Sequence, residues 1–478
     1  MSRSPRPAPR PEPLSEPEHY GLSFVGRAAA LREAEAPAHG LLLDVPEESF
    51  GHGSQNQIIE GDNLAVLRLL RQCIAGQVKL IYIDPPYNTG NDFLFRDKFH
   101  AGLRDYLRDT SQAARYGGRA GAREGDCELD GRFHSPWLAM MYPRLRLARE
   151  LLRDDGVLAV AIDAHEDANL ALLLDELFGR RNRIGTLAIQ SNPRGRHLER
   201  FIATSHELVH LYARDIARAV IHPAPLTAEQ RRDYRLRDEH GDYRLLGLRK
   251  RGAFSRQAER PTLHYPLYCD PETQAVDVEA QPGWVAVLPR LSSGEPGVWR
   301  WSREKVRSDR AQLVGRLVRG RREWDVFQKD YLRLDAARKH RSLWADGAVN
   351  YEHGRRELRA LLGEAVFDAV KPLGLMQRLE QLGSAGDDLV LDFFAGSGTT
   401  AHAVMAQNVV DGGRRRFICV QNAEKVAEKA VAARCGFTQV AQICRERVRR
   451  AAAALAASGA AGHDLGFAAR RFAAAPEQ

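Results

Sequence analysis

Short apolar runs alternate with segments of helical periodicity in the first and last parts of the chain. The run VKLIYI at 78–83 follows a helix predicted from leucines spaced three residues apart between Leu64 and Leu70. A second helix, predicted to end at Gly156, is followed by the apolar run VLAVAID at 157–163. Continuous apolar runs are typical of parallel strands buried on both faces, so this alternation predicts a doubly wound α/β sheet.

The alternation fades between about 216 and 349, where tryptophan and arginine are common, and returns after 350. Eight Lys or Arg residues against two acids lie between Trp301 and Arg322, and a solvated face is the alternative to a binding surface there. The pattern predicts a disordered Pro/Arg-rich tail, an α/β domain in two halves and a domain inserted between the halves. These parts are the tail at 1–20, the first half at 21–215, the insert at 216–349 and the second half at 350–478.

The composition narrows the class of protein. The net charge of the 478 residues is +8 and the isoelectric point is about 9.2, a balance that favours polyanionic partners without identifying one. No apolar run reaches the roughly 18 residues of a membrane span, so no membrane contact is expected. The six cysteines show no CxxC spacing, which suits a reducing cytoplasm and argues against a cysteine zinc site.

The segment IYIDPPYNTG at 81–90 ends a strand on an acid, two prolines and a tyrosine. Prolines cannot donate to a sheet ladder, so Pro85 and Pro86 mark the end of the strand and fix the backbone there. Asp84 then lies at the carboxyl end of a parallel strand, where doubly wound folds place their sites. Its carboxylate, a backbone carbonyl and the ring of Tyr87 suit a flipped base with an exocyclic amine. A rigid turn without function is the alternative for so short a motif.

The segment LVLDFFAGSGTT at 389–400 takes an apolar strand into an acid and then into a tight turn before a helix. Small residues such as Gly396 and Gly398 let a nucleotide-like ligand approach the backbone at a helix N-terminus. The turn is not a P-loop, because it lacks Gly-Lys-Ser/Thr. It is not GxGxxG either, because Ala401 stands where the third glycine would be. A purely structural turn is the alternative, although the strand-to-helix context favours ligand binding.

The two motifs, in this order, resemble the β group of amino-methylating DNA methyltransferases, which use S-adenosylmethionine. In that group the half with DPPY comes first, a target-recognition region follows, and the half with FAGSGTT comes last. The resemblance implies a circularly permuted, Rossmann-like α/β methyltransferase sheet with a target-recognition domain inserted at 216–349. It also implies that Asp84 and the Pro85 carbonyl bind the target amine, that Pro86 holds the turn, and that Tyr87 stacks on the base.

Further segments carry the resemblance, and each implies contacts with the cofactor. IIEGDNLAVLRLL implies that Asp62 and Asn63 reach its adenine, and FDAVKPLGLMQRL implies that Lys371 and Pro372 hold its methionine part. DGGRRRFICVQNAE implies that Glu424 binds the ribose hydroxyls. The glycine turn supplies the remaining predicted cofactor-binding residues, which are Asp392, Phe394, Gly396, Gly398 and Thr399.

Two stretches of the insert, DEHGDYRLLGLRKRGAFSRQAERPTLHYPLY and RREWDVFQKD, resemble the methylating (Mod) subunits of Type III restriction-modification systems. The resemblance implies methylation of N6 of a flipped adenine in double-stranded DNA, with no metal, together with a Mod dimer and a restriction (nuclease/helicase) subunit as partner. Aspartate in the first position of DPPY is typical of adenine enzymes, and N4 of cytosine is the alternative acceptor. The motifs are also compatible with a catalytically silent DNA-recognition protein of the same fold and with an RNA substrate.

Three further features have alternative interpretations. The first is the stretch ELVHLYA at 207–213, which resembles the strand that closes the base pocket in the methyltransferases. HELVH at 206–210 fits the zinc-protease pattern, but we predict a strand there, in which the histidines would lie about 13 Å apart. Two nitrogens bound to one zinc ion must lie within roughly 4 Å of each other. His165 and Glu166 are expected to form a surface pair, and the alternative is that they line the mouth of the site. A solvated face is expected for four arginines near a helix C-terminus, Arg445, Arg447, Arg449 and Arg450.

Overall fold

The computed structural model describes residues 21–90, 131–195, 201–318, 320, 322–333, 337–460 and 462–475. The chain divides into two compact units, one made of 1–223 with 340–478 and the other of 224–339. The insert predicted from the sequence, 216–349, is wider than the second unit. Its last residues include strand β16 (Leu343–Trp344), which pairs with β5 (Arg183–Ile189) in the sheet of the first unit. The predicted tail at 1–20 lies outside the described residues.

The first unit is built on a mixed sheet whose described strands follow the order β1-β19-β2-β18-β17-β3-β4-β6-β5-β16. The neighbours from β19 to β4 are parallel, and β6 runs antiparallel between β4 and β5. The remaining strands of this sheet are β1 (Leu41–Asp44), β2 (Gln57–Glu60), β3 (Val78–Ile83), β4 (Leu152–Ile162), β6 (Glu207–Ala213), β17 (Leu389–Asp392), β18 (Arg416–Gln421) and β19 (Ala468–Ala473).

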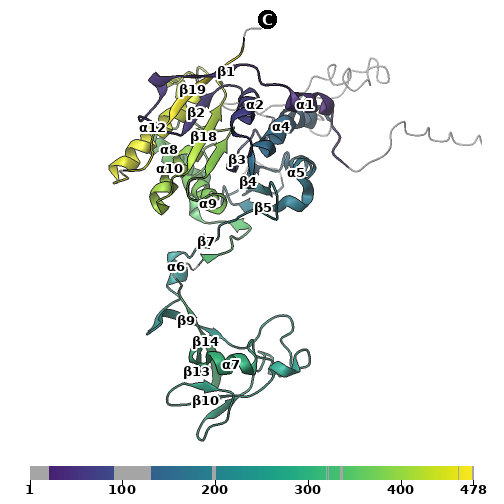
Figure 1. The fold of residues 1–478 in the computed structure, drawn as a ribbon, viewed down its shortest axis with the longest axis vertical. Helices are drawn as coiled ribbons and strands as arrows, with labels where there is room; N and C mark the ends of the chain where they lie inside the picture. Colours follow the sequence, from purple (N-terminus) through teal and green to yellow (C-terminus); the bar gives the residue numbers. More distant parts are fainter. Residues whose placement is uncertain are drawn as a thin grey trace, which may run out of the picture. The chain divides into compact units, whose positions relative to one another are not determined.

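Strands from the two ends of the chain meet in the middle of this sheet. β17 lies between β18 and β3, although β3 precedes it by about 300 residues in the sequence. The strand that leads into DPPY therefore comes first in the chain and the strand of the glycine turn comes late, while both occupy central places in one sheet. Figure 1 shows β3 of the first part of the chain and β18 of the last part in this sheet. The predicted fold class, a permuted Rossmann-like α/β methyltransferase sheet with an insertion, is confirmed.

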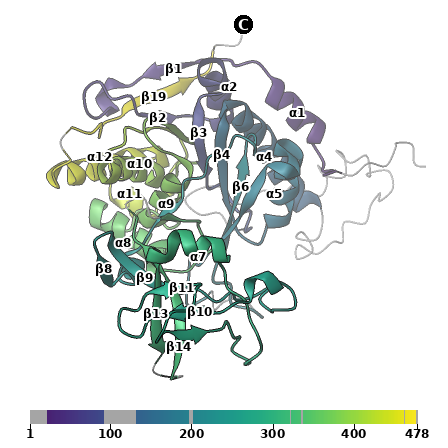
Figure 2. The same ribbon diagram turned by 60° about the horizontal axis from the view of Figure 1, so that its bottom comes forward.

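Helices cover both faces of the sheet, as doubly wound folds require. Helices α2, α4 and α5 pack on one face, and α9, α10 and α12 on the other (Figures 1 and 2). Their bounds, with those of the remaining helices of this unit, are α1 (Arg27–Glu35), α2 (Asn63–Ile74), α4 (Gly131–Leu151), α5 (Asp167–Leu174), α8 (Tyr351–Leu362), α9 (Leu373–Gly383), α10 (Thr399–Asp411), α11 (Val431–Arg434) and α12 (Val440–Ala457).

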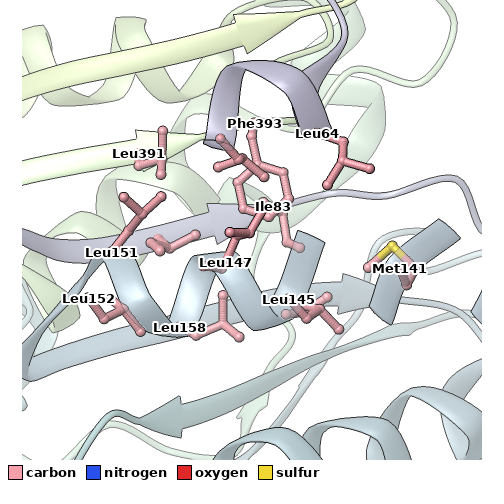
Figure 3. Packing of buried hydrophobic residues seen from close by; sticks show 14 of the residues in the cluster. Leu64, Ile83, Met141, Leu145, Leu147, Leu151, Leu152, Leu158, Leu391 and Phe393 are labelled. Carbon is pink, nitrogen blue, oxygen red and sulfur yellow. The ribbon is translucent and has the colours of Figure 1, made fainter. Parts of the chain in front are cut away.

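Alternate residues of each central strand enter opposite layers of the core, because successive side chains of a strand point to opposite faces. Leu391 of β17 joins the layer under α4, whereas its neighbour Val390 joins the layer under α10 and α12. Figure 3 shows Leu147 and Leu151 of α4 beside Leu391 and Leu158. Because both faces are covered, the central strands are mainly apolar, which explains the apolar runs in the sequence. The exception in β3 is Lys79, which is buried and pairs with Asp155.

In this unit the predicted end of one helix is wrong, and one strand was not predicted. Helix α4 ends at Leu151, not near Gly156, because Leu152 already pairs with Val78 and the ladder to β3 replaces helical hydrogen bonds. Strand β19 was not predicted, although it lies parallel to β2 and extends the sheet near the C-terminus. Its sequence, AARRFA, is short and contains two arginines, so its pattern alone does not indicate a strand.

The second unit is a small β structure with its own core. It contains sheets in the orders β11-β10-β12 and β13-β14-β9-β8, and the pair β15-β7. Trp299 is fully buried, and its Nε1 donates to the Tyr265 carbonyl at 2.8 Å. The bounds are β7 (Ala224–Pro225), α6 (Ala228–Arg231), β8 (Leu236–Asp238), β9 (Gly241–Gly247), β10 (Leu267–Cys269), β11 (Val276–Asp277), β12 (Val285–Val287), α7 (Arg303–Asp309), β13 (Leu313–Val318), β14 (Glu323–Tyr331) and β15 (Ala337–Arg338).

Within the described ranges, no helix combines the length and the apolar character needed to cross a membrane.

Candidate active site

The carboxyl ends of β3 and β17 open into one cavity. The two strands are parallel neighbours, with Leu391 beside Ile81, so Asp392 and Asp84 emerge at the same edge of the sheet. The cavity has a volume of about 630 Å³. The predicted site residues that line it are Asn63, Asp84, Pro85, Pro86, Tyr87, Lys371, Asp392, Phe394, Gly396, Thr399 and Glu424.

The ammonium group of Lys371 binds two carboxylates and a phenol in this cavity. Its Nζ lies 2.9 Å from Asp84 Oδ1, 3.2 Å from Glu207 Oε2 and 2.7 Å from the Tyr87 hydroxyl. The Tyr87 hydroxyl lies in turn 2.7 Å from Asp84 Oδ1 and 3.0 Å from Glu207 Oε2. Burial and the two carboxylates raise the pKa of Tyr87 well above its usual value, so its hydroxyl stays protonated. The cluster therefore holds one cation between two acids.

Glu207 is the member of this cluster that the sequence did not assign to the site. Its side chain is buried, and its Oε1 has no hydrogen-bond partner among the described residues. Burial raises the pKa of Glu207 to about 7, while the ammonium of Lys371 acts in the opposite direction. β6 runs antiparallel to β4, with Leu208 beside Ile162. The first residue of β6, Glu207, therefore lies at the edge of the sheet where the parallel strands β3 and β4 end. The available clue was that Glu207 begins the stretch whose sequence resembles the strand that closes the base pocket.

Hydrogen bonds from two buried side chains stabilise the turn after Asp84. Trp137 of α4 donates from Nε1 to the Pro86 carbonyl at 2.7 Å. Asn88 adopts a φ of 59°, in the left-handed region, and donates from Nδ2 to Glu166 Oε1 at 2.7 Å. Glu166 is fully buried and also accepts from Asn169, so the predicted surface position of Glu166 is wrong. Glu166 therefore holds Asn88 in place, and with it the end of the DPPY turn.

The glycine turn is held by the ends of three neighbouring elements. Asp392 Oδ1 accepts from the Phe394 backbone N–H at 3.0 Å, and its Oδ2 accepts from the Thr400 hydroxyl at 2.5 Å. Burial raises the pKa of Asp392 to about 7. The Gly396 N–H donates to Gln421 Oε1 of β18 at 2.7 Å, and Asn63 Nδ2 of α2 donates to the Phe393 carbonyl at 2.8 Å. These bonds fix the backbone of the turn along one wall of the cavity.

The model of a DNA methylase family matches residues 78–432 of the chain. That range includes DPPY, Glu207 and the glycine turn. The chain belongs to this DNA methylase family. It is therefore a DNA methyltransferase, as the order of its motifs predicts.

Curated relatives of the methylase support this assignment. The Type III restriction-modification enzyme EcoPI Mod subunit of Escherichia phage P1 is 31% identical over 450 residues, which cover 90% of this chain and 68% of the relative. The Type II methyltransferase M.KpnI of Klebsiella pneumoniae is 32% identical over 397 residues, covering 83% and 87%. The StyLTI Mod subunit of Salmonella typhimurium is 32% identical over 481 residues, covering 96% and 67%.

Three predicted cofactor-binding residues of the methylase do not line the cavity within the described part of the chain. Asp62 caps α2, where its Oδ1 accepts from the Ala65 N–H at 2.9 Å. Pro372 precedes the first residue of α9. Gly398 precedes α10 with a φ of 80°, and a Cβ built there would lie 2.9 Å from Cys444 Sγ. Their contacts with a cofactor stay predictions.

The crowding at Gly398 gives a stability prediction for the methylase. Gly398→Ala is expected to lower the free energy of unfolding by about 1–3 kcal/mol, because it adds left-handed strain and a clash with Cys444 of α12. Gly412→Ala at the other end of α10 is the matched control, since Gly412 has a φ of 71° with nothing within 4 Å of its Cβ position. Denaturant unfolding should show a larger loss for Gly398→Ala. Equal losses of unfolding free energy in the two variants would contradict the prediction, because the contact with Cys444 of α12 would then add no cost.

HELVH does not form a metal site of the zinc-protease kind. Glu207 to His210 belong to strand β6, as predicted, so the motif lacks the helical geometry that two zinc-binding histidines need. His210 Nε2 lies 2.7 Å from Asp167 Oδ1, and its Nδ1 lies 3.2 Å from the Thr186 hydroxyl. Among the described residues, no group of three or more His, Cys, Asp or Glu side chains could hold a metal ion.

Proposed function

We propose that the enzyme transfers the methyl group of S-adenosylmethionine to N6 of an adenine flipped out of double-stranded DNA. One observation carries the proposal. The cluster of Asp84, Tyr87 and Lys371 and the glycine turn at Gly396 line the same cavity. A single cavity can therefore bring a base amine and a methyl donor together, which is what a direct transfer requires.

The residues of the cavity fit the proposed cofactor. A Cβ built on Gly396 would meet nothing closer than Phe367 at 3.7 Å, so the glycine leaves room beside the backbone of the turn. We assign Phe394, Gly396 and Thr399 to contacts with the part of the cofactor that lies beside the glycine turn. Glu424 is assigned to the ribose hydroxyls of the cofactor, and Asn63 to its adenine. When bound, S-adenosylmethionine supplies an electrophilic methyl group on its sulfonium.

The protein's own part in the reaction is to hold the base and its amine. Asp84 Oδ1 is engaged by Lys371 and Tyr87, so we assign Oδ2 as the acceptor of one amine hydrogen. The Pro86 carbonyl is taken by Trp137, so we assign the Pro85 carbonyl as the second acceptor. Two acceptors on the amine hydrogens keep the nitrogen lone pair free for attack. The ring of Tyr87 stacks on the base, and stacking is worth about 1–3 kcal/mol.

The unit at 224–339 is our proposed target-recognition domain. Its Lys and Arg residues, including those between Trp301 and Arg322, suit contacts with phosphates and base edges. Similarity to the EcoPI and StyLTI Mod subunits favours a restriction-modification role, with a dimer of this chain and a restriction subunit as partner. We expect the activity in the cytoplasm, where the DNA substrate and a cofactor made in the cell are both present.

A product analysis tests this function. The protein is incubated with S-adenosylmethionine and mixed-sequence DNA that carries no prior methylation, and the digested nucleosides are identified by mass spectrometry. We expect N6-methyladenine. N4-methylcytosine would keep the mechanism but overturn the acceptor. Binding of DNA and S-adenosylhomocysteine without any product, on DNA containing all short sequences, would favour a silent DNA-recognition protein instead.

A further inference from the structure

Arg447 of α12 carries a buried positive charge beside the glycine turn. Its side chain is fully buried, and its Nη1 donates to the hydroxyl oxygens of Ser397 at 2.9 Å and Thr399 at 2.5 Å. Its Nε and Nη2 have no hydrogen-bond partner among the described residues. Burial lowers the pKa of Arg447 to about 10, so the group is still charged at neutral pH. The predicted solvated position of this arginine is wrong.

Arg445, two residues earlier on the same helix, shows what is missing at Arg447. It is nearly as deeply buried, so its predicted solvated position is wrong too. Its guanidinium lies 2.9 Å from Glu60 Oε2 and 3.0 Å from Glu48 Oε2. In the part of the chain that the structure describes, Arg447 forms no such ion pair. Glu357 of α8 acts on it only electrostatically, without contact. A buried charge without an opposite charge beside it is unfavourable, so an anionic ligand is its natural counter-charge.

The two hydroxyls that Arg447 binds line the cavity and link its charge to a ligand. Each hydroxyl oxygen accepts from Arg447, so its own hydrogen points elsewhere. Thr399 donates its hydrogen to the Lys371 carbonyl at 3.3 Å. The Ser397 hydroxyl lies 3.5 Å from Thr399 Oγ1, at the long limit of a hydrogen bond, so its hydrogen can turn to a stronger acceptor in the cavity. α10 begins at Thr399 with no side-chain cap, which leaves first-turn N–H groups and the positive end of a 13-residue helix at the same place.

The ammonium group of Lys371, which also lines this part of the cavity, is already engaged. It holds Asp84 and Glu207, so its charge is balanced within the cluster. We propose that Arg447, acting through Ser397 and the N-terminus of α10, positions the carboxylate of the cofactor's amino-acid part. The inference rests on the proposed cofactor. The proposal assigns the carboxylate of the cofactor to Arg447 and Ser397, whereas the resemblance implies that Lys371 and Pro372 hold the methionine part.

A ligand pair that differs only in the carboxylate tests this. S-adenosylhomocysteine and its decarboxylated analogue, S-adenosyl-3-thiopropylamine, are titrated against the protein by calorimetry without DNA. The parent protein should prefer the ligand with the carboxylate by about ten- to a hundredfold, the usual range for hydrogen bonds to a charged group. Arg447→Met should reduce this preference to less than about threefold, and Arg447→Lys should restore part of it.

The comparison of the two ligands separates positioning from packing. If Arg447→Met weakens both ligands equally and keeps their ratio, Arg447 only supports the turn and the inference fails. Ser397→Ala keeps the buried arginine and should also lower the ratio, so the test survives if Arg447→Met does not fold. Arg450→Met is the control, because Arg450 is half exposed and pairs with Glu446 on the same helix. A parent protein that binds neither ligand would overturn the proposed cofactor itself.

Discussion

Asp84→Asn is expected to lower the rate of methyl transfer by at least about a hundredfold, the usual loss when an oriented group that stabilises developing charge is removed. The substitution keeps the shape of the side chain but removes its negative charge. Its amide oxygen can still accept from Lys371, but the charge that pairs with the ammonium at 2.9 Å is lost, and the acceptor for the base amine is weaker. The amount of N6-methyladenine formed per minute, measured by mass spectrometry at saturating DNA, gives the rate.

Two controls define what this loss means. Asp84→Asn should bind S-adenosylhomocysteine within about threefold of the parent, because Asp84 lies on the DPPY side of the cavity and the glycine turn is unchanged. Asp163→Asn, beyond the end of β4, is a matched charge removal outside the lining of the cavity and should keep the activity. A rate for Asp84→Asn within tenfold of the parent would show that the DPPY acid does not carry the chemistry.

Glu207→Gln is expected to lower the maximal rate by about ten- to a hundredfold and to change how the rate depends on pH. The pKa of Glu207 is raised to about 7, so the carboxyl group is protonated below that pH and ionised above it. Only the ionised form pairs fully with Lys371 and Tyr87. The parent rate should therefore rise as the pH increases through about 7, and the glutamine variant should lack this rise.

A second buried acid must be separated from Glu207. The pKa of Asp392 is also raised to about 7, so a rise in rate near that pH has two possible sources. Asp392→Asn keeps the acceptor for the Phe394 N–H and should retain the rise if Glu207 causes it. Rates measured from pH 5.5 to 8.5 on both variants decide between them. A pH rise that persists in Glu207→Gln and disappears in Asp392→Asn would refute the role given to Glu207.

Local patterns in the sequence determined the class of fold and the two motifs. Apart from Lys79, the run at 78–83 and the strand before Asp392 are apolar because helices cover both of their faces, and that requirement is visible in the sequence. DPPY and the glycine turn are equally local, since prolines and glycines restrict the backbone where they stand. Their order along the chain was enough to indicate the permuted fold and the family.

The tertiary structure decided which charges face one another. Tyr87 meets Glu207 across 120 residues of sequence and Lys371 across 284, and no local pattern encodes such a meeting. The periodicity of α12 likewise could not show that Arg447 faces the glycine turn while Arg450 stays half exposed, because both lie on a helix rich in arginine. Burial and partners depend on the neighbouring elements. The sequence therefore identified the reaction, and only the folded chain showed how its buried charges are balanced.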